Sequence, residues 1–157
     1  TVDKDLTIST VNATVADGKL YSFYISGIYN ATTKTVEGFV VEDPLATTFD
    51  FTQSYVRLVN AISNAAPMTL FVKNTTTNVE SAIGAAVPYK GAGAFVAIPG
   101  GVYDIATRLA GSSTNAIART AISFNAGKVY TITSRGDITV VSTTLATRPQ
   151  LDNTANR

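Results

Sequence analysis

The sequence contains no cysteine, no histidine and no tryptophan. Without cysteine there are no disulfides, and thiolate chemistry is excluded. Without histidine the chain lacks the usual general base near neutral pH and the commonest metal ligand. A Ser-His-Asp triad and a histidine-ligated zinc site are therefore excluded. Only carboxylate, lysine, tyrosine and hydroxyl chemistry is left, so we expect a protein that is not an enzyme and holds no cofactor.

Charge is also scarce, since only 15% of the residues are charged, 12 of them basic and 11 acidic. The basic residues are scattered singly, so no stripe of positive charge is available to neutralise phosphates. No apolar run reaches the ~18 residues that a membrane-spanning helix needs. The composition predicts a soluble globular protein that binds no nucleic acid and does not span a membrane.

What the sequence does contain is threonine and valine in alternating patterns, which favour β-strands. Apolar residues recur at every second position between turn residues, as expected of half-buried strands. About ten short strands predict an all-β fold, an antiparallel immunoglobulin-like β-sandwich, with a closed barrel as the alternative. The expected strands are 6–15, 20–28, 35–41, 54–62, 68–72, 101–109, 117–124, 128–134 and 137–145, with 79–87 either a strand or a short helix.

The chain contains an internal repeat. The run Asp-Gly-Lys-Leu-Tyr-Ser at 17–22 recurs as Ala-Gly-Lys-Val-Tyr-Thr 109 residues later, at 126–131. Residues 7–15 resemble 116–124 at the same offset. Repetition at a fixed offset indicates a duplicated structural unit. We therefore predict four parts: a closing half-module at 1–45, a connector at 46–52, a complete module at 53–148, and a polar tail at 149–157 that frays.

Residues 53–148 resemble a bacterial family, the domain of unknown function 4397. The matching motifs, in order, are Arg-Leu-Val-Asn-Ala at 57–61, the turn at 63–67, Val-Pro-Tyr at 87–89, Ile-Pro-Gly-Gly-Val-Tyr-Asp at 98–104, and the repeat run at 126–131. The resemblance implies a secreted or surface-attached module, often in tandem, with no established catalysis. It also implies an extracellular or cell-surface location in bacteria.

A half-module leaves strand edges and an apolar face uncovered, and proteins cover such edges. Its strands can fold onto the complete module, pair with a neighbouring copy, or be left over from truncation. Pairing between copies predicts a non-catalytic structural protein, a self-assembling fibre subunit that uses β-strand complementation. The candidate interaction residues are Leu6, Ile8, Val11, Val15, Tyr21, Tyr24 and Tyr29.

The tyrosines at positions 21, 24 and 29 also support an alternative, a surface adhesion module. Exposed tyrosine stacks on sugar rings or lines a protein contact. The partner would then be a glycan or another surface protein. Ordinary alternation of core and rim residues explains the same cluster without a ligand.

Acidic residues give no metal or catalytic site. Asp3 with Asp5, and Glu42 with Asp43, lack the spacing of a calcium-binding loop. A glycosidase needs two carboxylates on facing walls of a cleft, and the sequence does not place Glu80 and Asp104 in that way. We interpret the two pairs at 3/5 and 42/43 as solvated turn residues.

Overall fold

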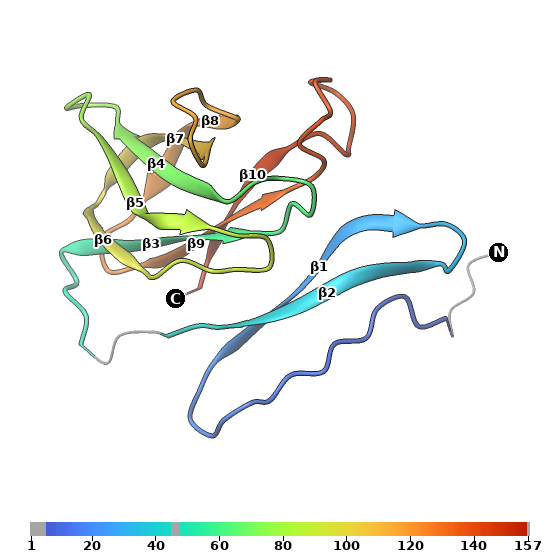
Figure 1. The fold of residues 1–157 in the computed structure, drawn as a ribbon. Coiled ribbons are helices and arrows are strands. Elements are labelled where there is room, and N and C mark those ends of the chain that lie inside the picture. The colour runs from blue at the N-terminus through green and yellow to red at the C-terminus, as the bar shows by residue number, and fades with distance from the viewer. Residues whose placement is uncertain (1–5, 45–47, 157) are drawn as a thin grey trace.

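The computed structural model describes residues 6–44 and 48–156 (Figure 1). Over these residues the chain forms ten strands and no helix, so the all-β prediction is confirmed. Residues 79–87, for which a helix was the alternative, form a strand from Glu80 onward. The strands are β1 (Tyr21–Asn30), β2 (Thr35–Glu42), β3 (Gln53–Asn60), β4 (Met68–Asn74), β5 (Glu80–Val87), β6 (Val96–Pro99), β7 (Gly101–Leu109), β8 (Ile117–Phe124), β9 (Val129–Arg135) and β10 (Gln150–Ala155).

Strands β3 to β10 form an open β-sandwich of two sheets. One sheet has the order β10-β9-β3-β6 and the other β5-β4-β7-β8. The core between them is aliphatic and aromatic, with Leu58, Leu70, Ile105, Phe124 and Ile132 almost fully buried. All pairs are antiparallel except β3 with β9, which run parallel. Parallel neighbours need a long connection, and the strands β4 to β8 between β3 and β9 in the sequence provide it.

Strands β1 and β2 form a separate antiparallel hairpin. The hairpin lies against the outer face of the sheet that contains β3 (Figure 1). Phe39 and Val41 of β2 pack there on Val59 and Ala61, with Tyr24 alongside. Strand β3 is therefore covered on both faces, so every residue from Val56 to Asn60 is buried, including the polar Arg57 and Asn60.

The predicted strand at 6–15 is wrong. In the described part of the chain these residues are extended but make no ladder, and one backbone hydrogen bond, from Val36 N to Ile8 O at 2.8 Å, joins them to β2. A strand requires a neighbour that pairs along its length. Alternating apolar residues indicate that one side of a segment is buried. They do not show that another strand lies alongside to pair with it.

Two further predictions fail at the C-terminal end. Residues 137–145 form a loop, in which Asp137 and Ser142 side chains cap nearby backbone N–H groups. The tail that was expected to fray instead contributes β10, which pairs with β9 from Gln150 to Ala155. Leu151 anchors β10 in the core.

Candidate interaction surface

The inner face of the hairpin is packed on the sandwich. Tyr24 stacks on Phe39 with ring centroids 5.1 Å apart, and Phe39 meets Tyr89 edge to face at 6.3 Å. These rings close over Val59 and Ala61 of the sandwich. Tyr24 is therefore part of an internal contact, which is not the exposed position that a sugar-stacking tyrosine needs.

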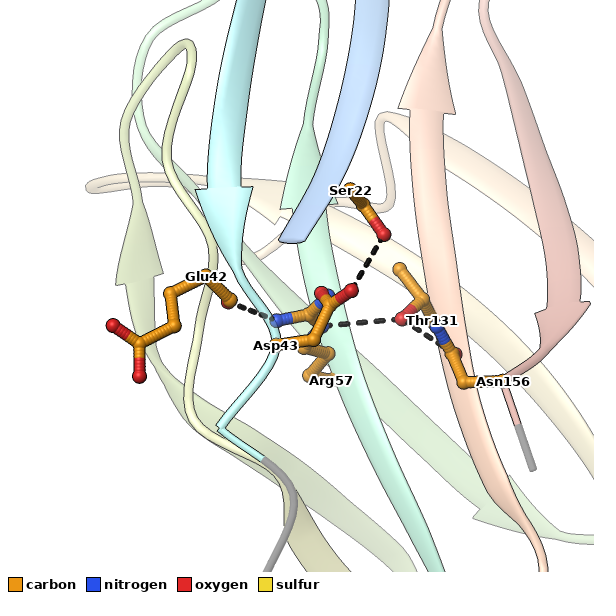
Figure 2. Close-up of polar contacts among 6 residues, drawn as sticks. All are labelled: Ser22, Glu42, Asp43, Arg57, Thr131 and Asn156. Carbon is orange, nitrogen blue, oxygen red and sulfur yellow. Dashed lines mark hydrogen bonds and ion pairs between the residues drawn. The ribbon is translucent and has the colours of Figure 1, made fainter. Parts of the chain in front are cut away.

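Arg57 fixes the end of the hairpin to the sandwich (Figure 2). Its side chain is fully buried, with the guanidinium 4.5 Å from the ring centroid of Phe95. It donates to Thr131 Oγ1 at 3.1 Å, to the carbonyl of Glu42 at 3.0 Å, and to the carboxylate of Asp43, with which it forms an ion pair. One side chain thus ties β3 and β9 to the end of β2.

A second polar contact fixes the middle of the hairpin. Tyr89 donates to Glu37 Oε2 at 2.6 Å, and Lys90 Nζ lies 3.0 Å from the same oxygen. The Tyr89 hydroxyl also lies 3.0 Å from Ser26 Oγ. The Tyr89 hydrogen bond, together with Lys90, holds the pKa of Glu37 below its ordinary value. Burial, reinforced by Glu37, raises the pKa of Tyr89.

The outer face of the hairpin is apolar and largely uncovered. Phe23 and Ile25 alternate on it and are 55% and 56% exposed. Residues 6–16 cross part of this face beside β2, where a methyl group on Gly38 would come within 2.7 Å of both Ser9 Oγ and Val11 Cγ2. Within the described ranges β1 pairs only with β2, so its other edge is open. An open edge beside an exposed apolar face is a surface suited to strand addition.

The predicted interaction residues lie at different places around the hairpin. Leu6, Ile8 and Val15 are exposed on the front segment, and Val11 is half-buried against Gly38. Tyr21 is half-buried on β1, where its hydroxyl accepts a hydrogen bond from Ala16 N. The structure therefore gathers the front segment and Tyr21 around the hairpin and separates them from Tyr24 on its inner face.

Tyr29 lies at the far end of β1 and is exposed. It lines an open cleft of about 480 Å³ between the hairpin and the end of β9. Ile25 and Ile28 supply apolar walls, and Arg135 and Asp137 supply charge. Asp3 and Asp5 lie outside the described residues. Glu42 and Asp43 serve as partners of Lys19 and Arg57, and Glu80 as a partner of Arg108.

The repeat is visible in the backbone. Gly18 and Gly127 both have positive φ, 71° and 74°, at the turns that precede β1 and β9. Tyr21 and Tyr130 each accept a backbone hydrogen bond, at 3.0 Å, from the residue five positions earlier. Tyr55 likewise accepts a hydrogen bond from Asp50 N, so this feature is not confined to the two copies of the repeat.

The strand pairs β1–β2 and β9–β10 end in the same hydrogen bonds, a feature more specific to the repeat than the tyrosine bond. Asp43 N donates to Leu20 O at 2.7 Å, and Asn156 N donates to Val129 O at 2.7 Å. Ser22 donates to the side chain of Asp43 at 2.7 Å, and Thr131, which follows Ser22 by 109 positions, donates to that of Asn156 at 2.8 Å. Hairpin β1–β2 thus shares with β9–β10 the glycine turn that precedes it, its antiparallel pairing and its closing polar contact.

Sequence reasoning missed Phe23 and Ile25 as surface residues and Arg57 as an anchor. Phe23 and Ile25 occupy alternate positions with Tyr24, and only the packing shows which face is covered. Arg57 carried a usable signal, because it stands between Val56 and Leu58 in an apolar strand. A charge in such a strand is buried only with partners.

The described residues contain no group of three acidic side chains that could hold a metal ion. The same residues include no helix long and apolar enough to cross a membrane.

Fold and surface together define an all-β sandwich module with an additional hairpin packed on it. A family model described as Domain of unknown function (DUF4397) matches residues 54–157, most of the chain, and the chain belongs to this family. A search of curated proteins finds no match to the chain.

Proposed function

We propose that this chain is a non-catalytic structural protein of a bacterial surface, in which the β1–β2 hairpin joins one β module to another. The immunoglobulin-like architecture and the extracellular location belong to this proposal. The observation that carries it is the outer face of the hairpin, where Phe23 and Ile25 are exposed beside an open strand edge. Exposed apolar faces next to open edges mark interaction sites.

Copies of the chain are the partners that this surface suggests first. Each copy offers the open edge of β1 as an acceptor, and residues 6–15, which one backbone hydrogen bond joins to β2 within the described residues, as a segment that can be donated. A donor of one copy on the acceptor of the next is a head-to-tail contact. Such contacts build filaments when the rotation does not close a ring.

The experiment is light scattering with size-exclusion chromatography, and electron microscopy, on the purified chain over a range of concentrations. We expect species larger than the 16.5 kDa monomer, and filaments, at high concentration. Ile25→Ser should reduce assembly, whereas Val141→Ser, at an exposed loop position, should not. Monomers alone at the highest concentration would rule out assembly between copies.

Adhesion is the second candidate, and the observation that favours it is the position of exposed Tyr29 on the cleft. A cleft with an aromatic wall and charged residues suits a sugar or a peptide. Binding to a glycan array that is lost in Tyr29→Ala would support this function. An array without signal, together with unchanged cell adhesion by the variant, would exclude it.

A further inference from the structure

We infer that the outer face of the β1–β2 hairpin is completed by an opening half-module, meaning a β unit with the strand order and sequence pattern of residues 53–109. The inference rests on the proposed role of the hairpin as an assembly surface, and it names the partner. Within this chain, residues 53–109 form β3 to β7, of which β3 pairs with the edge of β9 while β4, β5 and β7 belong to the sheet that covers the corresponding face of β9–β10. The chain therefore contains its own example of the contact.

The front hairpin corresponds to β9–β10, because the same kind of glycine turn precedes β1 and β9 and both strand pairs end in the same closing contacts. The ladders set Gly38 opposite Ile25 and Leu151 opposite Ser134. Residues 6–16 lie over Gly38 of β2, and β8 lies over β10, where Arg119 donates to Leu151 O at 3.0 Å. The front segment, β1 and β2 thus occupy the places of β8, β9 and β10.

Corresponding positions of the two hairpins differ in burial. Ile132 and Ser134 of β9 are fully buried, whereas Phe23 and Ile25, 109 positions earlier, are more than half exposed. Ile132 is covered by the opposite sheet, and β9 pairs with β3 along its edge from Val129 to Ser134. The matching edge of β1 is open within the described residues. What the hairpin lacks is therefore a β3-like strand and the sheet that lies across from it.

The incoming strand would also make a polar contact. Arg57 of β3 donates to Thr131 of β9 at 3.1 Å, and Ser22 holds the place of Thr131 on β1. Ser22 Oγ has lone pairs to accept such a bond while it donates to Asp43. A β3-like strand in the same register would place an arginine beside Ser22, so the partner strand should carry arginine at the position of Arg57.

Copies of the chain can add a strand to the edge of β1, but they do not supply the sheet that would lie across from it. Each copy has two closing units, the front hairpin and 116–156, but a single opening half. If the opening half of one copy packs on the hairpin of another, the β9–β10 face of the first copy becomes uncovered. The number of covered apolar faces then stays the same. A strand donated by a copy would pair with the edge of β1 and leave the face without an opposite sheet. The partner is therefore an additional opening half.

The experiment supplies that half by fusing a second copy of residues 53–109 directly ahead of Thr1. The offset of the repeat gives the fused junction the same spacing as Leu109–Ala110 in the chain. Hydrogen exchange of β1 is then measured in the fusion and in the unmodified chain. We expect exchange at the open edge of β1 to slow by about tenfold or more, as for a newly paired strand. The matched control carries Val56→Asp and Leu58→Asp in the added copy alone and should show no slowing.

A cysteine pair gives a second readout that does not depend on stability. Leu58 pairs with Ile132 in the parallel ladder, so the added copy of Leu58 should lie beside Phe23. The chain has no cysteine, so Leu58→Cys in the added copy with Phe23→Cys can form only one disulfide within the chain. We expect it to form faster than the same added cysteine with Val141→Cys. Equal rates, or unchanged exchange of β1 while residues 53–156 stay protected, would overturn the inference.

These results are separable from the test of assembly. Monomeric behaviour of the unmodified chain, with protection of β1 in the fusion, would remove assembly between copies and support the opening half as partner. Filaments of the unmodified chain that disappear in the fusion would support both. Filaments that persist in the fusion, with β1 unprotected by the added half, would support assembly and contradict the inference.

Discussion

At the scale of single residues, Arg57 shows how a buried charge joins two layers. Three of its five N–H groups donate to acceptors on β2, on the following residue Asp43, and on β9. A buried ion pair adds little net stability compared with an apolar replacement of both residues, but it fixes position, and removing one partner leaves a buried charge unpaired. Arg57 therefore sets where the end of the hairpin lies.

Replacing Arg57 with methionine should lower the free energy of unfolding by about 3–5 kcal/mol, because Asp43 would remain nearly buried without its partner. Arg135→Met is the control, since Arg135 and Asp152 form an ion pair that is 45% exposed on both sides. That change should cost no more than about 1 kcal/mol. Urea denaturation measures both, and equal losses would contradict the role of Arg57.

The contact of Glu37 with Tyr89 predicts a dependence of hairpin docking on acid pH. The pKa of Glu37 is lowered in the folded state from an ordinary 4.5, first by the Tyr89 hydrogen bond. The stabilisation is therefore complete above the ordinary value and is lost as pH falls through the lowered one. The protection factors of the β2 amides, which correct for the pH dependence of intrinsic hydrogen exchange, should fall over this range in the native chain. Glu37→Gln should flatten that response, and an identical acid response in the variant would refute the assignment.

At the scale of elements, the sequence predicts strands well where an apolar face and a pairing partner coincide. Residues 117–124 form β8 with the expected bounds, because their alternating face meets the core and β7 pairs alongside. Residues 6–15 alternate in the same manner but lack a counterpart of β7 in the described chain. β10 shows the opposite case, since its sequence is polar apart from Leu151 and Ala155 and its strand conformation comes from the ladder with β9.

Leu151 should therefore matter more than its polar surroundings suggest. It is 3% exposed in the core, so Leu151→Ala should destabilise the chain by about 2–5 kcal/mol. Leu145→Ala is the matched control, because Leu145 is 54% exposed and its truncation should change stability by less than about 0.5 kcal/mol. Thermal unfolding distinguishes the two. A mild effect of Leu151→Ala would mean that β10 frays, as the polar sequence alone suggests.

Gly38 tests the packing of the front segment on β2. A methyl group there would approach Ser9 and Val11 to 2.7 Å, so Gly38→Ala should displace residues 6–16 and cost about 1–3 kcal/mol. The control is Gly93→Ala, where the new methyl group meets its nearest neighbour, on Val87, at 3.4 Å. Limited proteolysis should cut the front segment of the first variant faster than that of the second. Equal cleavage would show that the segment does not rest on Gly38.

At the scale of the whole molecule, the chain consists of a sandwich, a hairpin packed on its outer face, and a front segment beyond the hairpin (Figure 1). The family model matches residues 54–157, so the number of copies stays a prediction. The repeat in the sequence predicts a duplicated unit around β1 and β9. The repeat does not indicate which face of the hairpin is covered, because apolar side chains stand on both faces of β1 and only the packing distinguishes them. Tyr24 and Phe23 are neighbours in sequence, yet Tyr24 is half-buried against Phe39 and Phe23 faces outward.

The measurement that tests the central claim most directly is hydrogen exchange of β1 in the protein as isolated from its native source, compared with the purified chain in dilute solution. If the outer face of the hairpin joins modules, the amides around Phe23 and Ile25 should exchange much more slowly in the native material. Exchange as fast in the native material as in dilute solution would contradict the claim, because the face would then be solvated where the protein works.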